Sequence, residues 1–122
     1  MQNGTQNNRD GLAVLPDEIL KQMSAHAASE PIELCGFIYE NHYEPLTNVL
    51  RSPYRFYADP AQVARMLSCY GEPLAIFHTH PNGNLHLSDE DRSLWYYRNS
   101  TMIVGCIRDG HLHWKMYGNR SD

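Results

Sequence analysis

The sequence predicts an α/β domain, in which helices pack against a β-sheet. Three observations support this fold class: two segments with helical spacing of apolar residues, several short apolar runs typical of strands, and a hairpin signal near the C-terminus. The chain has 122 residues, of which 42% are hydrophobic. That length fits one compact domain with one core, after a polar tail at residues 1–11 that we expect to be disordered.

The first predicted elements are a helix and a buried strand. The helix follows Pro16, which suits a first turn, and it carries Ile19, Met23 and Ala27 at helical spacing. The apolar run I-E-L-C-G-F-I-Y-E at residues 32–40 is short enough to be a strand. Two further extended segments are expected among the prolines and Asn48 that follow, in the motifs V-L-R-S and R-F-Y-A.

A second helix is expected between Asp59, which precedes Pro60, and Gly71, because these residues suit the two ends of a helix. Its inward stripe would consist of Val63, Met66, Leu67 and Tyr70. The next run, L-A-I-F-H-T-H, is predicted to be a strand from its brevity and apolar content.

The C-terminal part of the chain predicts a third helix and a β-hairpin. The helix would run from Ser88 to about Arg98, after a Pro-Asn-Gly-Asn loop. The hairpin would join M-I-V-G-C-I-R to H-L-H-W-K-M-Y through Asp109-Gly110, a dipeptide typical of two-residue hairpin turns.

Charge and composition argue against several classes of protein. The net charge of -4 provides no basic surface for nucleic acid or an anionic membrane. Without a signal peptide or a membrane span, the chain is expected to be a soluble cytoplasmic protein. The odd number and wide spacing of Cys35, Cys69 and Cys106 argue against disulfides or a zinc clip, so three buried free thiols are expected.

The stretch H-T-H-P-N-G-N-L-H-L-S-D-E-D suggests a metal site. His78 and His80 are two apart in a predicted strand, so both imidazoles can project from one face. Asp91 could return across the loop as a third ligand, leaving the open position of a catalytic zinc. The alternative is that Ser88 and Asp91 form a helix capping box, which is compatible with ligation by Asp91.

A zinc hydrolase also needs a general base, and Glu33 is the candidate. On the predicted strand its carboxylate shares a face with Cys35 and Phe37, among apolar neighbours. The alternative is an edge strand on which Glu33 is solvated. His111 and His113 repeat the H-x-H spacing, but no acid or thiol follows them, so we interpret them as one face of a strand.

These residues resemble the JAMM (MPN-plus) zinc metalloproteases of compact prokaryotic or phage type. The matching positions are Glu33 in E-L-C-G-F, His78 and His80 in H-T-H-P, then Ser88 and Asp91, and the resemblance covers residues 12–117, leaving a short tail at 118–122. It implies a mixed sheet flanked by helices, in a cytidine-deaminase-like fold. It also implies one zinc ion held by His78, His80 and Asp91, with Glu33 as general acid/base and Ser88 bonding the oxyanion.

The resemblance further implies a substrate class. Members of the family hydrolyse peptide or isopeptide bonds after the C-terminal Gly-Gly of ubiquitin or ubiquitin-like proteins, so a ubiquitin-like protein or its conjugate is the expected partner. Two alternatives remain open. P-Y-R-F-Y-A-D-P also resembles phage-tail peptidase domains, which process a tail protein, and related domains without the metal ligands are non-catalytic scaffolds.

Overall fold

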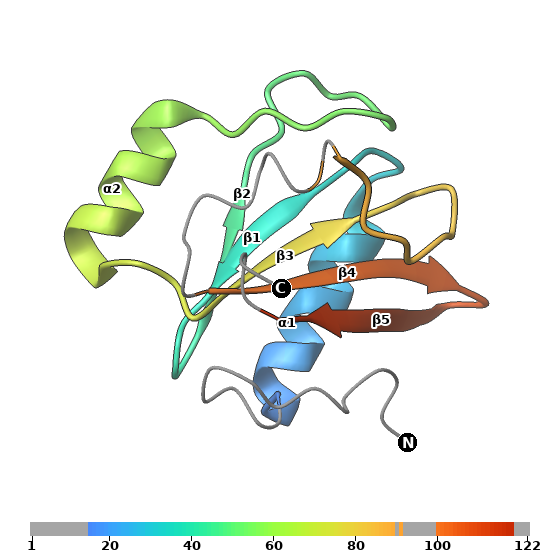
Figure 1. Ribbon diagram of the computed structural model, residues 1–122, viewed down its shortest axis with the longest axis horizontal. Coiled ribbons are helices and arrows are strands. Elements are labelled where there is room, and N and C mark those ends of the chain that lie inside the picture. Colours follow the sequence, from blue (N-terminus) through green and yellow to red (C-terminus); the bar gives the residue numbers. More distant parts are fainter. Residues whose placement is uncertain (1–14, 90, 92–99, 119–122) are drawn as a thin grey trace.

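The computed structural model describes residues 15–89, 91 and 100–118, in which five strands and two helices form one α/β unit (Figure 1). The elements in chain order are α1 (Asp17–Ser29), β1 (Cys35–Ile38), β2 (Tyr43–Leu46), α2 (Pro60–Tyr70), β3 (Ala75–Thr79), β4 (Thr101–Arg108) and β5 (His111–Tyr117). The predicted tails at 1–11 and 118–122, apart from residue 118, lie outside the described residues, as does most of the predicted third helix.

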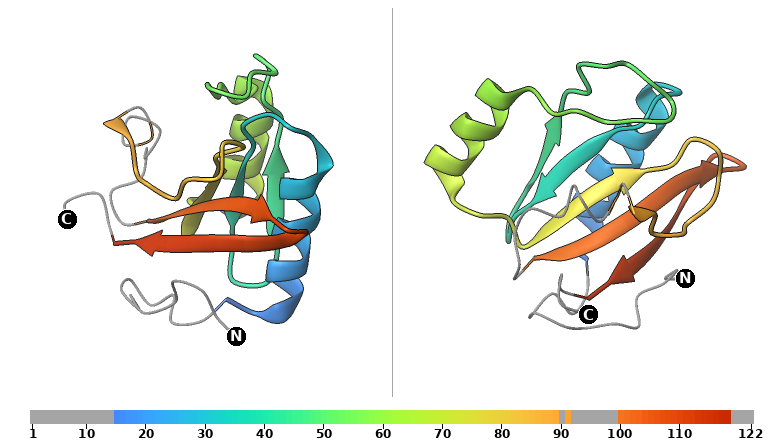
Figure 2. Two further views of the ribbon diagram at one scale, coloured as in Figure 1. Left: turned by 90° about the vertical axis from the view of Figure 1, so that its right-hand side faces the viewer. Right: turned by 45° about the horizontal axis from the view of Figure 1, so that its top comes forward.

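The five strands form a single mixed sheet in the order β2-β1-β3-β4-β5. β3 and β4 are parallel, whereas the other neighbouring pairs are antiparallel. Both views in Figure 2 show β1 and β3 in the interior of the sheet. The expected α/β class with a mixed sheet is therefore confirmed.

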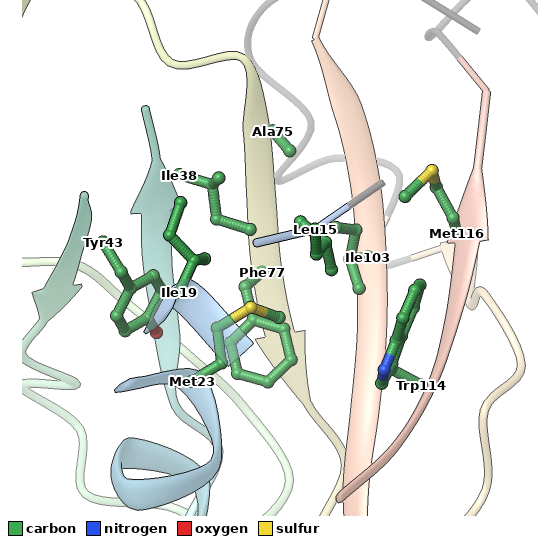
Figure 3. Close-up of a cluster of buried hydrophobic side chains, with 10 residues drawn as sticks. All are labelled: Leu15, Ile19, Met23, Ile38, Tyr43, Ala75, Phe77, Ile103, Trp114 and Met116. Carbon is green, nitrogen blue, oxygen red and sulfur yellow. The ribbon is translucent and has the colours of Figure 1, made fainter. Parts of the chain in front are cut away.

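Apolar residues alternate along the strands and form a core on each face of the sheet. One core lies between α1 and the sheet, and Figure 3 shows Met23 of α1 against Phe77 of β3, with Ile19 of α1 near Tyr43 and Ile38. The other core brings Met66 of α2 against residues such as Ile76. The helices thus cover opposite faces, as expected for a sheet sandwiched between helices.

Local signals correctly predicted α2 and the hairpin. The Asp59 carboxylate accepts a hydrogen bond from the Ala61 N–H, and Gly71 has a φ of 80° at the C-terminal end. At the β4–β5 turn, Asp109 and Gly110 have φ angles of 54° and 79°. Two successive positive φ angles are the signature of a type I′ turn.

Three expectations were wrong. V-L-R-S and R-F-Y-A do not form strands, and an isolated bridge joins Asn48 to Ala58 instead. The Asn48 side chain bonds to the backbone of Glu33, Arg55 and Tyr57, and so takes hydrogen bonds that a partner strand would make. Tyr70, expected to face inward, is 50% exposed. Cys69, expected to be buried, is exposed, because α2 contacts the core along a narrow stripe that includes Met66.

Neither helix within the described residues has the length and apolar character needed to cross a bilayer.

Candidate metal centre

The pairing of β1 with β3 determines where the polar residues meet. Cys35 is the register partner of His78. One residue further on, the Thr79 N–H donates to the Leu34 carbonyl at 2.8 Å, and the Leu34 N–H donates to the Thr79 hydroxyl oxygen at 2.8 Å. Continuing this register places Glu33 opposite His80, on the face that also carries His78.

Glu33 is a buried residue two positions before β1, with only 9% of its surface exposed. β1 lies between β2 and β3, so the alternative of a solvated edge position is wrong. The backbone of Glu33 is held on both sides: its N–H donates to the Ser52 carbonyl at 2.9 Å, and its carbonyl accepts from the Asn48 amide at 2.8 Å. The carboxylate itself lies 3.3 Å from Nε2 of His78.

His78 and His80 lie at the C-terminal end of β3 and just beyond it, and both are buried. Their ring centroids are 5.1 Å apart, with nearly perpendicular planes. The edge-on ring of Phe56 closes one side of His78 at 6.3 Å. Both imidazoles therefore project from the same side of the strand, as predicted.

Asp91 completes the convergence from the far end of the 81–88 loop. Its Oδ1 lies 2.9 Å from Nε2 of His78, and its Oδ2 lies 2.9 Å from Nε2 of His80. Asp91 also takes part in the predicted capping box: its Oδ2 accepts from the Ser88 N–H, and its own N–H donates to the Ser88 hydroxyl. Capping and convergence on the histidines occur together, because one carboxylate has enough acceptor positions for both.

The arrangement fits a bound cation. Glu33, His78 and His80 each offer a ligand atom within 4.8 Å of the others. Although Nε2 of His78 is close to Asp91, the contact is not aligned as a hydrogen bond, and this buried nitrogen has no hydrogen-bond partner among the described residues. Two imidazoles and a carboxylate are a common ligand set for zinc, and here either Glu33 or Asp91 lies near enough to be the carboxylate. A cation among these groups would satisfy the unbonded nitrogen.

The electrostatics of the site also favour a cation. Burial alone raises the pKa of Asp91, but His78 and His80 outweigh it and hold that pKa well below its usual range. Burial alone lowers the pKa of His78, but Asp91, Cys35 and Glu33 together raise it well above its usual value. The pKa of His80 is raised in the same way, against burial and mainly by Asp91. The site therefore attracts positive charge even in a buried setting.

A groove of about 620 Å³ opens onto these residues. One wall is the segment 50–57 between β2 and α2, and the other is the loop that follows His80. Glu33, His80, Ser88 and Asp91 line the groove between the two walls. An extended peptide could therefore reach the polar cluster from solvent.

The family to which the chain belongs follows from comparison with known proteins. The model for prokaryotic homologs of the JAB domain matches residues 16–117. The chain belongs to this family. The match covers all the described elements of this JAB domain, and the resemblance inferred from the motif is confirmed at the level of the family.

Solved structures support the fold of this JAB domain. A protein from Desulfitobacterium hafniense, solved in solution, is 23% identical over 82% of this chain and 79% of its own, with a TM-score of 0.63. A second solution structure, from Salinibacter ruber, is 22% identical over 83% of this chain and 78% of its own, with a TM-score of 0.55. No curated protein sequence is significantly similar to this chain.

Two asparagines beside the centre were not identified from the sequence. Asn48 is buried and bonds to the Glu33 carbonyl, and Asn84 contacts the imidazole of His80. Their roles depend on backbone groups that are distant in the chain or reached through a turn. Asn82 and Asn84 within P-N-G-N were the available signal, because asparagine side chains commonly bond the backbone in turns.

Proposed function

We propose that this JAB domain is a zinc-dependent metallopeptidase or isopeptidase that hydrolyses the bond after the C-terminal Gly-Gly of a ubiquitin-like protein. One observation carries the proposal: Asp91 lies 2.9 Å from both His78 and His80, with Glu33 3.3 Å from His78, inside a groove that is open to solvent. Membership of the JAB family, which is similar in motif to the JAMM metalloproteases, supports the same conclusion.

His78, His80 and Asp91 would hold the ion. A zinc ion bound there would supply Lewis acidity toward water and toward the scissile carbonyl. Asp91 suits a ligand because both of its oxygens already face imidazoles, and the Ser88 N–H fixes its carboxylate.

Glu33 would move the proton. Its carboxylate borders the groove, and within the part of the chain that the structure describes its one ion-pair contact is with Nε2 of His78. It can therefore accept a proton from attacking water and return that proton to the leaving amine. Ser88 borders the same groove, and its hydroxyl would stabilise the oxyanion once it turns from the Asp91 N–H.

The groove suits an extended, flexible peptide rather than a folded surface. Its outer wall carries Leu50, Tyr54 and Tyr57, which are all more than half exposed and can pack along a peptide. A narrow C-terminal tail such as Gly-Gly could pass between these residues and the loop that follows His80.

The proposal is tested by incubating the zinc-loaded protein with a panel of ubiquitin-like proteins fused through Gly-Gly to a reporter, and measuring product masses. We expect cleavage directly after the second glycine, loss of cleavage with a chelator, and recovery when zinc is added back. The His78→Ala variant should lose both zinc and cleavage. Cleavage that persists under chelation, or no cleavage of any fusion by the zinc-loaded protein, would contradict the proposal.

A further inference from the structure

The loop after His80 is fixed to the sheet at several points. The Gly83 N–H donates to the His80 carbonyl at 3.0 Å and closes a turn in which Gly83 has a φ of 92°. The Cys106 thiol of β4 bonds to the Gly83 carbonyl, and the Tyr117 hydroxyl of β5 donates to the Leu85 carbonyl at 2.7 Å. These contacts hold residue 84 beside the imidazole of His80.

Asn84 presents two oxygens to the ring nitrogen of His80 that faces away from Asp91. Nδ1 of His80 lies 3.2 Å from the backbone carbonyl oxygen of Asn84 and 3.2 Å from its side-chain Oδ1. Oxygens of both kinds only accept hydrogen bonds, so this nitrogen must carry a proton to bond to either.

Two further contacts fix which way the Asn84 amide points. Its Nδ2 donates to Oδ1 of Asn82 at 2.9 Å, and its Oδ1 accepts from the His86 N–H at 2.9 Å. Reversing the amide would break both bonds. The oxygen is therefore held toward His80 by the loop itself.

We infer that Asn84 is a positioning residue for the candidate metal centre: it holds a proton on Nδ1 of His80, so that Nε2, which faces Asp91 at 2.9 Å, is the nitrogen that exchanges its proton for the ion. The inference rests on the proposed metal site. Outer partners of this kind orient a ligating imidazole, and removing one typically weakens metal affinity about 10- to 100-fold.

Among the described residues, no side-chain oxygen bonds Nδ1 of His78, so the effect of Asn84 falls on His80. Nδ1 of His78 is buried without a hydrogen-bond partner among the described residues. Its neighbour across the β1–β3 pair is Cys35, whose thiol is a weaker hydrogen-bond group than an amide. Loss of the Asn84 side chain therefore removes the side-chain oxygen that bonds Nδ1 of His80, and His78 has no corresponding contact among the described residues.

The test measures zinc affinity by competition with a chromophoric chelator, independently of catalysis. We expect Asn84→Ala to weaken zinc binding about tenfold. Asn84→Asp, which keeps an oxygen facing His80 and the acceptor for the His86 N–H, should bind zinc more tightly than Asn84→Ala. Asn41→Ala, an asparagine in the exposed turn between β1 and β2, is the matched control and should bind zinc unchanged.

Proton NMR of the zinc-loaded protein gives a second readout, which a general loosening of the fold would not produce. The Nδ1–H signal of His80 should exchange with solvent more slowly in the original protein and in Asn84→Asp than in Asn84→Ala, where only the backbone carbonyl of residue 84 can still accept this proton. Equal affinity and equal protection in Asn84→Ala would overturn the inference while leaving the proposed peptidase intact. Zinc binding that depends on Asn84 without cleavage of any fusion would support the inference and contradict the peptidase, and a chain that binds no zinc would contradict both.

Discussion

Glu33 and Asp91 are both buried carboxylates beside the same pair of imidazoles, yet their surroundings differ. Both oxygens of Asp91 lie 2.9 Å from a histidine nitrogen, and one of them also accepts from a backbone N–H. Glu33 has one looser contact, at 3.3 Å, and borders the groove. A fully engaged carboxylate suits a ligand, and a less engaged one suits proton transfer.

This difference predicts that Glu33→Gln separates metal binding from catalysis. The amide has nearly the same shape but cannot accept a proton from water, so cleavage should fall about a hundred- to ten-thousandfold while one zinc ion stays bound. Peptidase assays and metal analysis of the same sample measure the two effects. The exposed Glu40→Gln is the matched control, and full activity in Glu33→Gln would remove Glu33 from the mechanism.

His26 of α1 is expected to make the stability of the folded chain depend on pH. Its Nδ1 lies 2.7 Å from the Tyr43 hydroxyl, and burial lowers its pKa despite an opposing charge from Glu30. The unfolded chain therefore binds this proton more readily than the folded chain. The contribution of neutral His26 to the free energy of unfolding is complete above about pH 6.5, and it is lost as the pH falls through the pKa of His26 in the folded chain.

Denaturant unfolding at several pH values tests this effect. We expect the unfolding free energy of the original protein to fall more between about pH 7.5 and about pH 5 than that of His26→Gln. The exposed His111→Gln is the control and should keep the original dependence. Identical slopes for all three proteins would show that His26 does not titrate in this range.

At the scale of whole elements, the glycine in E-L-C-G-F has a packing role. A Cβ on Gly36 of β1 would lie 2.1 Å from the hydroxyl oxygen of Tyr43, on the face covered by α1. Real side chains do not approach so closely, so an added methyl group must displace a buried ring that also contacts His26.

Gly36→Ala should therefore lower the unfolding free energy by about 1–3 kcal/mol through overpacking. Thermal or denaturant unfolding gives the value. Shortening the opposing side chain in the double variant Gly36→Ala with Tyr43→Leu should recover part of the loss. If the losses of unfolding free energy caused by the two changes simply add, the residue 36 methyl group and the Tyr43 ring do not clash.

The elements that the sequence predicted are those specified by local signals. Asp59 and Gly71 mark the ends of α2 by their own hydrogen bond and φ angle, and Asp109-Gly110 forms the β4–β5 turn by itself. β2 was missed because Pro45 interrupts a short run whose strand character depends on pairing with β1. The extended loop after it is organised by Asn48, whose partners are backbone groups of distant residues.

The site was more predictable than the fold around it. His78 and His80 lie two residues apart at the end of β3 and just beyond it, and Ser88 with Asp91 forms a helix start, so each pair is arranged by local geometry. That these pairs meet Glu33 depends on the β1–β3 register, which a single sequence does not specify. The family motif supplied that information.

The exposed aromatic wall between β2 and α2 is expected to strengthen the binding of a peptide substrate. Tyr57 lines the groove and is 51% exposed, whereas Tyr70, at 50% exposed, lies on α2 among Tyr39 and His42 and does not border the groove. Tyr57→Ala should lose about 1 kcal/mol of apolar contact with a bound peptide, or about fivefold in kcat/KM, mainly through KM. Tyr70→Ala should leave the kinetics unchanged, and equal effects of both would argue against this wall.

For the whole molecule, the candidate metal centre joins segments that are far apart in the chain. Glu33, His78 and Asp91 converge from three separate parts, and an ion that binds only this arrangement stabilises the folded state by mass action. Zinc at about a hundredfold excess over its dissociation constant should add about 2.7 kcal/mol and raise Tm by about 5 °C or more.

Thermal melts with zinc and with a chelator measure this shift. His80→Ala should abolish it, whereas His113→Ala on β5 should retain it, although β5 carries the same H-x-H spacing. A shift that survives in His80→Ala but not in His113→Ala would move the metal to the second pair of histidines.

The β1–β3 pairing has a consequence for how chains of this kind tolerate changes in length. Because successive side chains of a strand alternate between faces, one residue inserted between Glu33 and the first paired position of β1 would turn the carboxylate away from the histidines and toward α1. In the connection from β2 to α2, Asn48 and Ser52 bond to the backbone of Glu33, whereas the exposed residues 53–55 belong to no strand. Natural insertions and deletions among relatives should therefore collect in that connection, where they reshape the groove and leave Glu33 and the two histidines in place.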